Sequence, residues 1–85
     1  MDKTVYSERG RRLAGLLCQL RREAGMTQAD LAARLDVPRQ VVSRIERGER
    51  RVDVVELDII CTALGVSTVS AVWRFLSDDS ADGKP

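Results

Sequence analysis

The chain has 85 residues, of which 44% are hydrophobic and 32% are charged, and its net charge is +1. This length supports one compact core and excludes a second, and a core of that size is only marginally stable by itself. No run approaches the ~20 consecutive apolar residues of a membrane span, and the polar N-terminus lacks the apolar segment of a secretory signal. We therefore expect a cytoplasmic protein with no membrane partner.

The residues that carry most enzyme and metal chemistry are missing or scattered. The chain has no histidine, the commonest general base and zinc ligand. Its two cysteines, Cys18 and Cys61, match no metal-ligand spacing, which favours reduced thiols packed as small hydrophobic side chains over a redox pair. No glycine-rich phosphate-binding loop is present either. The sequence therefore predicts neither an enzyme nor a bound metal or cofactor.

The small net charge conceals an uneven distribution. Residues 1–52 contain 12 Lys and Arg against 7 Asp and Glu, a net charge of +5. Residues 53–85 contain 2 Lys and Arg against 6 Asp and Glu, a net charge of −4. A basic region beside an acidic one indicates an anionic partner on one side of the molecule.

An apolar stripe predicts the first helix. Its spacing of i, i+3, i+4, i+7 and i+11 is typical of one helix face, and its members are Leu13, Leu16, Leu17, Leu20 and Ala24. Gly25 follows the last member and is a favourable C-terminal cap. We therefore expect a helix over 7–24.

Two shorter helices are predicted next. Thr27 is a favourable N-cap and Asp30 lies in the first turn, which indicates a helix over 28–35. Residues 36–38 end it, and the proline among them is tolerated in the first turn of a third helix, expected over 38–47. Val42 and Ile45 are the inward pair of that third helix.

The chain closes with two further predicted helices. Asp53 is expected to cap the fourth and Ser67 the fifth. The fourth helix has an inward stripe that consists of Leu57, Ile60, Cys61 and Leu64. We expect one domain over 1–76 and a disordered acidic tail over 77–85, where apolar residues are scarce. With no strand alternation, the predicted fold class is all-α, with five short helices.

The functional signal lies in residues 27–48, TQADLAARLDVPRQVVSRIERG. With Val42 and Ile45 turned inward, the opposite face of the third helix presents long polar side chains, among them Gln40 and Arg44. Such a face suits the major groove of B-DNA, where Arg hydrogen-bonds guanine and Gln hydrogen-bonds adenine. The alternative for any single helix of this kind is a solvated charged face with no partner.

The pieces LRREAGMTQADLAARLDV, SRIERGER and ALGVS resemble the helix-turn-helix family of lambdoid phage repressors, Cro proteins and related bacterial xenobiotic-response-element (XRE) regulators. The resemblance covers about 13–67, roughly two-thirds of the chain. It implies a compact five-helix lambda-repressor-like DNA-binding domain, with the helix-turn-helix formed by the second and third helices. The third helix then enters the major groove, usually within a two-fold dimer.

The resemblance also assigns roles to individual residues. The positions that face bases are Arg39, Gln40, Ser43 and Arg44. Those that contact phosphates are Gln28, Arg47, Arg50 and Arg51. It implies a structural ion pair between Arg21 and Glu46, which joins the first and third helices. Pro38 departs from the family, which more often has a Ser or Thr there, so a capping hydroxyl is lost.

The fifth helix is the expected dimer seam. Its apolar stripe consists of Val69, Val72, Trp73 and Leu76. Two interpretations of Trp73 remain open, since it either caps the small core or contributes to the seam. The sequence thus predicts a DNA-binding transcriptional regulator, expected to be a repressor, which acts on the nucleoid as a homodimer on a two-fold operator. The alternative is an antitoxin or another protein-interaction component, and the lack of a long partner-wrapping extension counts against it.

Overall fold

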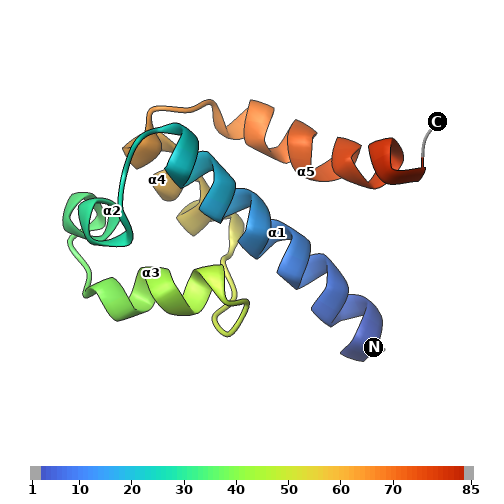
Figure 1. Ribbon diagram of the computed structural model, residues 1–85, viewed down its shortest axis with the longest axis horizontal. Helices are drawn as coiled ribbons and strands as arrows, with labels where there is room; N and C mark the ends of the chain where they lie inside the picture. Colours follow the sequence, from blue (N-terminus) through green and yellow to red (C-terminus); the bar gives the residue numbers. More distant parts are fainter. Residues whose placement is uncertain (1–2, 84–85) are drawn as a thin grey trace.

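The computed structural model describes residues 3–83, and the side chains of residues 8–77 within them. This part of the chain is organised as five helices: α1 (Lys3–Glu23), α2 (Gln28–Leu35), α3 (Arg39–Glu46), α4 (Val54–Leu64) and α5 (Thr68–Gly83). Figure 1 shows α3 along one side of the molecule and α5 along the opposite side, with α1 between them. α1 packs against both α3 and α5, while α4 packs against α2 and α5. The predicted all-α, five-helix fold class is confirmed.

Short capping motifs begin the helices where the sequence predicts. Thr27 starts α2 in a capping box, in which its Oγ1 accepts a hydrogen bond from the Asp30 amide at 3.0 Å. Asp53 starts α4 in the same way and accepts from the Glu56 amide at 2.8 Å. Each cap satisfies amide groups that the first helical turn leaves without a partner. The local sequence therefore fixes the start of both helices.

Three helix ends differ from the sequence-based expectation. α1 begins at Lys3 rather than near residue 7, and Pro38 lies just outside α3 as an N-cap without a side-chain hydrogen bond. α5 continues to Gly83, although disorder was expected from residue 77. No proline or glycine occurs between Gly65 and Gly83, so the backbone chemistry there does not stop a helix. The acidic side chains of 78–85 lie outside the described residues.

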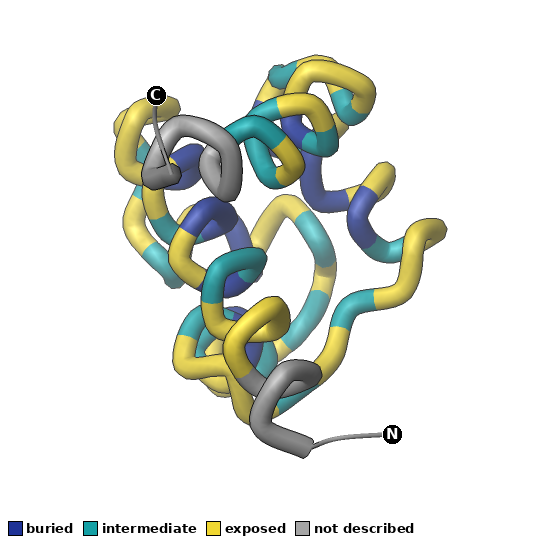
Figure 2. Tube along the Cα trace, turned by 90° about the vertical axis from the view of Figure 1, so that its right-hand side faces the viewer, coloured by how far each residue is buried: buried dark blue, intermediate teal, exposed yellow. Residues whose placement is uncertain are grey.

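All five helices contribute to one apolar core. Figure 2 shows the buried stretches turned toward the middle of the molecule and the exposed ones outside. The buried members are Leu16, Leu17, Leu20, Leu31, Ala32, Val42, Ile45, Leu57, Ile60, Cys61, Leu64 and Ala71. Burial of such side chains stabilises the fold by ~1.5–3 kcal/mol for each large residue. Among the described side chains of α5, only the small Ala71 is fully buried, so most of the buried core comes from α1–α4.

Within the described residues, no single helix combines the length and apolar character needed to cross a membrane. By length and composition alone, α4 and the first part of α5 together are long and apolar enough for a membrane-spanning segment, but the two helices are bent by 111° relative to each other.

Candidate nucleic-acid interface

A tight turn sets the position of α3 against α2. Asp36 takes a left-handed backbone conformation, with φ 59°, which Asp tolerates better than most L-residues. The Asp36 and Val37 amides donate to the carbonyls of Ala33 and Ala32 at 3.2 and 3.0 Å, which closes the end of α2. Ala32 is 3% exposed, so its small side chain is packed where the two helices approach each other. The turn holds α3 in one orientation.

α3 has an apolar face and a polar face. Val42 and Ile45 are buried in the core and anchor the helix. Arg39, Gln40 and Arg44 are exposed on the other side, and Ser43 is half-exposed. Three of the four predicted base-contacting side chains therefore reach solvent from a helix whose inner face is fixed.

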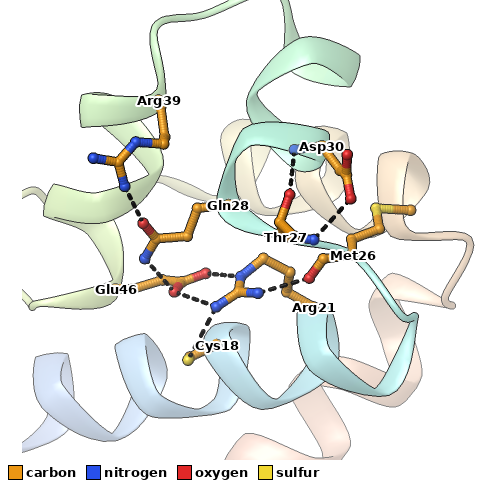
Figure 3. A network of polar contacts seen from close by, with 8 residues as sticks. All are labelled: Cys18, Arg21, Met26, Thr27, Gln28, Asp30, Arg39 and Glu46. Carbon is orange, nitrogen blue, oxygen red and sulfur yellow. Dashed lines mark hydrogen bonds and ion pairs between the residues drawn. The ribbon is translucent and has the colours of Figure 1, made fainter.

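An ion pair beneath this helix joins α1 to α3 (Figure 3). Arg21 Nε and Nη2 donate to the two carboxylate oxygens of Glu46 at 2.7 and 3.0 Å. Arg21 Nη1 also donates to the Met26 carbonyl at 2.7 Å. The two charged side chains are only 9% and 6% exposed. This bidentate geometry compensates much of the cost of removing both charges from water.

The environment of Glu46 acts on its pKa in opposite directions. Burial by itself raises the pKa, because it disfavours the charged carboxylate. Hydrogen bonds from Arg21 and Gln28 favour the charged form and bring the pKa of Glu46 below its ordinary value. The hydrogen bond with Glu46 likewise raises the pKa of Arg21. Both groups therefore remain charged at neutral pH.

Gln28 extends this pair to the surface. Its Nε2 donates to Glu46 Oε1 at 2.9 Å, and its Oε1 accepts from Arg39 Nη1 at 2.9 Å (Figure 3). Arg39 is therefore oriented by Gln28, and through it by the buried pair. The sequence placed Gln28 and Arg39 at the interface, but it did not indicate that they contact each other.

The loop of residues 47–51 carries the remaining predicted phosphate contacts. Arg47 donates to Ser43 Oγ at 2.7 Å and forms an ion pair with Glu49 at 3.1 Å. Arg50 forms an ion pair with Glu56, the partner of Asp53 in the capping box of α4, at 2.8 Å. These contacts lower the pKa of Glu49 and of Glu56. Arg47 and Arg50 are thus placed by carboxylates that sequence reasoning missed, because the Arg50–Glu56 contact depends on how the loop folds back.

The opposite side of the molecule is apolar. Trp73 is 65% exposed, so it does not cap the core. Val69 and Leu76 are exposed beside it, whereas Val72 is half-buried. α4 adds exposed Val54, Val55 and Ile59, which sequence reasoning missed. We call these exposed residues the apolar face: Val54, Val55, Ile59, Val69, Trp73 and Leu76.

A signal for the α4 part of this face was present in the sequence. Eight of the eleven residues of α4 are apolar, more than one inward stripe requires. A hydrogen bond from Thr68 to Asp58 at 2.5 Å fixes the start of α5 against α4, next in sequence to Val69 and Ile59. The exposed residues Ile59 and Val69 therefore flank the point where α4 and α5 meet.

The two thiols are free, with Cys18 half-buried and Cys61 fully buried. Burial raises the pKa of the Cys61 thiol. No three Cys, Asp or Glu side chains among residues 8–77 are grouped closely enough to hold a metal ion.

Comparisons with known proteins identify the family. A family model described as Helix-turn-helix matches residues 19–70. The chain is 43% identical over 63 residues to a protein of Sinorhizobium fredii (strain NBRC 101917 / NGR234) named as an uncharacterized HTH-type transcriptional regulator, y4dJ. That match covers 73% of this chain and 82% of the relative.

Two solved structures carry the same fold. An XRE-family like protein from Pseudomonas syringae pv. tomato str. DC3000 is 36% identical, with a TM-score of 0.81 over 92% of this chain and 95% of that one. The restriction-modification controller protein C.Esp1396I, described as a tetramer in complex with its natural 35 base-pair operator, is 30% identical. Its TM-score is 0.75 over 82% of this chain and 92% of that one. The predicted resemblance is confirmed, and the chain belongs to the helix-turn-helix family of XRE-type (Cro/C1-type) transcriptional regulators.

Proposed function

We propose that this regulator is a repressor that binds a two-fold DNA operator as a homodimer and places α3 of each copy in the major groove. The observation that carries the proposal is the two-sided character of α3. Val42 and Ile45 fix its inner face, while Arg39, Gln40 and Arg44 project from the other. A helix that binds in the groove needs both a fixed inner face and exposed hydrogen-bond donors. The protein then acts on the nucleoid, in the cytoplasm.

The polar side chains of α3 differ in whether hydrogen bonds within the protein already hold them in place. Gln40 and Arg44 are exposed and make no side-chain hydrogen bond in the described structure, so they are the principal base contacts. Arg39 is held by Gln28, and Ser43 accepts from Arg47. Preorganised side chains lose less conformational entropy when they bind. Arg39 and Ser43 therefore add base contacts of fixed geometry.

The loop and Gln28 supply the phosphate contacts. Arg47, Arg50 and Arg51 lie just past the C-terminal end of α3, and Gln28 lies at the N-terminal end of α2. Contacts to phosphate hold a groove-bound helix in register without reading sequence. Glu49 and Glu56 compete with phosphate for Arg47 and Arg50, so DNA binding exchanges two ion pairs within the protein for ion pairs with DNA.

The apolar face is the dimer interface in this proposal. Exposed Val69, Trp73 and Leu76 are large apolar side chains of a kind that monomeric proteins seldom expose together. α3 and α5 lie on opposite sides of the domain (Figure 1), so self-association leaves the α3 surface open. Two copies then place their third helices about 34 Å apart along one face of the DNA.

Selection of bound duplexes from a random DNA pool tests the proposal. We expect enrichment of an inverted repeat whose half-sites are spaced by about one helical turn, ~10 base pairs. Binding of the selected site should depend on Gln40 and Arg44, whereas Arg22→Ala, an exposed arginine at the far end of α1, serves as the control. Enrichment of a single half-site, or of none, would contradict the proposal.

A further inference from the structure

A cleft lies between the N-terminal half of α1 and the loop that joins α3 to α4. Its volume is about 610 Å³, within the range of ~300–1,000 Å³ that is typical of small-molecule sites. Its rim carries one carboxylate, Glu49, and several arginines: Arg9, Arg11, Arg47, Arg50 and Arg51. The rim is therefore strongly cationic and suits an anionic group.

The floor of the cleft is apolar. It is formed by Leu13, Ala14, Leu17, Ile45, Val52 and Phe75. Phosphates of DNA account for arginines on the rim, but they do not account for a cleft beneath them whose apolar lining is half-buried at Leu13, Val52 and Phe75. Burial of apolar ligand surface against such a floor is favourable. The floor therefore fits a ligand that is itself partly apolar.

The apolar surface continues beyond this cleft. A second hollow, of about 190 Å³, shares Leu13, Val52 and Phe75 with it and continues to Val54 and Val72 between α4 and α5. Arg12 lies over the Phe75 ring, with its guanidinium carbon 5.1 Å from the ring centroid, and this contact holds the shared wall in place. Apolar side chains thus line both the cleft with the cationic mouth and the hollow next to it.

A glycine at the mouth is unexplained by packing. Gly10 lies inside α1, where glycine costs roughly 0.5–1 kcal/mol relative to alanine. A Cβ added there meets no atom within 4 Å, so no neighbouring group of the protein requires its absence. Gly10 lines the cleft, whereas Gly15, with equally open surroundings, does not. A helical glycine that lines an open cleft permits close approach of a ligand to the backbone.

Two arginines at the mouth are available to an anion. Arg9 and Arg11 make no ion pair with a carboxylate among the described residues, unlike Arg47 and Arg50 on the same rim. Arg11 reaches toward the loop, since a Cβ on Gly48 would lie 3.6 Å from its Cγ. The guanidinium groups of Arg9 and Arg11 therefore supply hydrogen-bond donors of the geometry that suits a carboxylate.

We propose that this cleft binds an amphipathic carboxylate of the fatty-acid class. The carboxylate accepts hydrogen bonds from Arg9 and Arg11 at the mouth. The unbranched hydrocarbon chain lies over Gly10 and against the apolar floor of the cleft, which includes Phe75. The ligand is held by charge at one end and by apolar burial along the rest, which matches how the two parts of the cleft differ.

Occupation of the cleft opposes DNA binding. Arg47, Arg50 and Arg51 belong to the rim and are also the phosphate contacts of the proposed function, on which this consequence rests. An anion at the mouth lowers the positive potential that attracts phosphates. The regulator therefore releases its operator when the ligand is abundant.

The direct test is titration of the full chain with sodium decanoate, below its micelle concentration, followed by backbone amide NMR. Decanol and decyltrimethylammonium serve as uncharged and cationic probes of equal chain length. We expect one saturable site for decanoate, with the largest shifts at Gly10 and Gly48. Gly10→Leu should weaken it by about tenfold or more, and the matched Gly15→Leu should change it by no more than about twofold, as is usual for a surface substitution. Circular dichroism checks that both variants are folded.

Absence of saturable binding, equal binding of the cationic probe, or equal effects of the two leucine variants would overturn the ligand site. A second titration uses the selected operator. Decanoate should raise the apparent dissociation constant of the wild type for DNA and leave that of Gly10→Leu nearly unchanged. Decanoate binding without any operator binding would contradict the proposed function alone. Decanoate binding with unchanged operator affinity would overturn the proposed opposition between the two ligands.

Discussion

The α3 side and the α5 side of this domain are built on different principles. On the α3 side, the exposed functional side chains are charged or polar. A chain of hydrogen bonds runs from buried Arg21 through Glu46 and Gln28 to Arg39, whereas Gln40 and Arg44 stay outside it. On the described part of the α5 side, the large exposed side chains are apolar, with Trp73 at 65% exposure. Polar networks fix geometry, while open apolar surface favours association. This difference indicates that the α3 side suits an anionic partner and that the α5 side suits contact with a second protein surface.

The largest expected effect comes from breaking the buried pair on the α3 side. Glu46→Ala leaves Arg21 charged and without its carboxylate partner, so the free energy of unfolding should fall by up to ~3–5 kcal/mol. The double variant Arg21→Met/Glu46→Leu should lose much less, because no unpaired charge remains. Denaturant melts of both single variants and the double variant measure the coupling.

The exposed pair between Arg74 and Glu23 is the control for this comparison. Its oxygen and nitrogen are 3.0 Å apart, but both side chains are accessible to water, so Glu23→Ala should change stability little. Strictly additive losses for Arg21 and Glu46 would mean that the pair does not stabilise the fold as a unit.

On the apolar face, Trp73→Ala should weaken self-association while the monomer keeps its helices. The side chain contributes little to the core and a large area to the surface. Loss of an aromatic residue at the centre of an interface is expected to raise the dimer dissociation constant by at least about tenfold, or ~1.4 kcal/mol. Sedimentation velocity over a concentration series gives the value, with exposed Ser70→Ala on the same helix as control. A wild type that stays monomeric at micromolar concentration would remove the basis for this interface.

The buried pair also predicts a pH dependence. The pKa of Glu46 is lower in the folded protein than its ordinary value, so its contribution to stability is fully present above the unfolded pKa of about 4.3. That contribution is lost as pH falls through the folded pKa. The stability difference between the wild type and Glu46→Gln should therefore be large at neutral pH and narrow below about pH 4. Thermal melts between pH 7 and pH 3 test this. If the stability difference between the wild type and Glu46→Gln stayed constant over this range, the charged form of Glu46 would not be its source.

The smallest effect is expected from the carboxylates of the loop. Glu49 pairs with Arg47 and competes with phosphate, so Glu49→Gln should raise DNA affinity modestly at low salt without changing sequence preference. Asp58→Asn, on α4 and away from the loop, changes the net charge by the same amount. Comparison of the two variants therefore separates the local effect of Glu49 on Arg47 from the effect of net charge. Equal gains from both variants in fluorescence anisotropy would show a general charge effect instead.

Much of this architecture could be predicted from the sequence because its signals are local. The Thr27 and Asp53 caps and the inward pair of Val42 and Ile45 are encoded within a few residues. The cleft beside Gly10 depends on how distant segments pack, and the Arg50–Glu56 contact depends on how the loop folds back onto α4; no short motif specifies either. The helical extension to Gly83 was missed for a related reason, because acidic composition says little about where a continuous helix ends.

On the α3 side, the proposed function gives α3 the reading of sequence and gives the loop of residues 47–51 only the holding of DNA. The most direct test compares Arg44→Ala with Arg51→Ala, each titrated with the selected operator and with a random duplex at several salt concentrations. We predict that Arg44→Ala weakens operator binding by ~1–3 kcal/mol and reduces the operator-to-random affinity ratio. Arg51→Ala should weaken both duplexes alike and make the salt dependence shallower by about one unit. An unchanged affinity ratio for Arg44→Ala would contradict the assignment of α3 as the sequence-reading element.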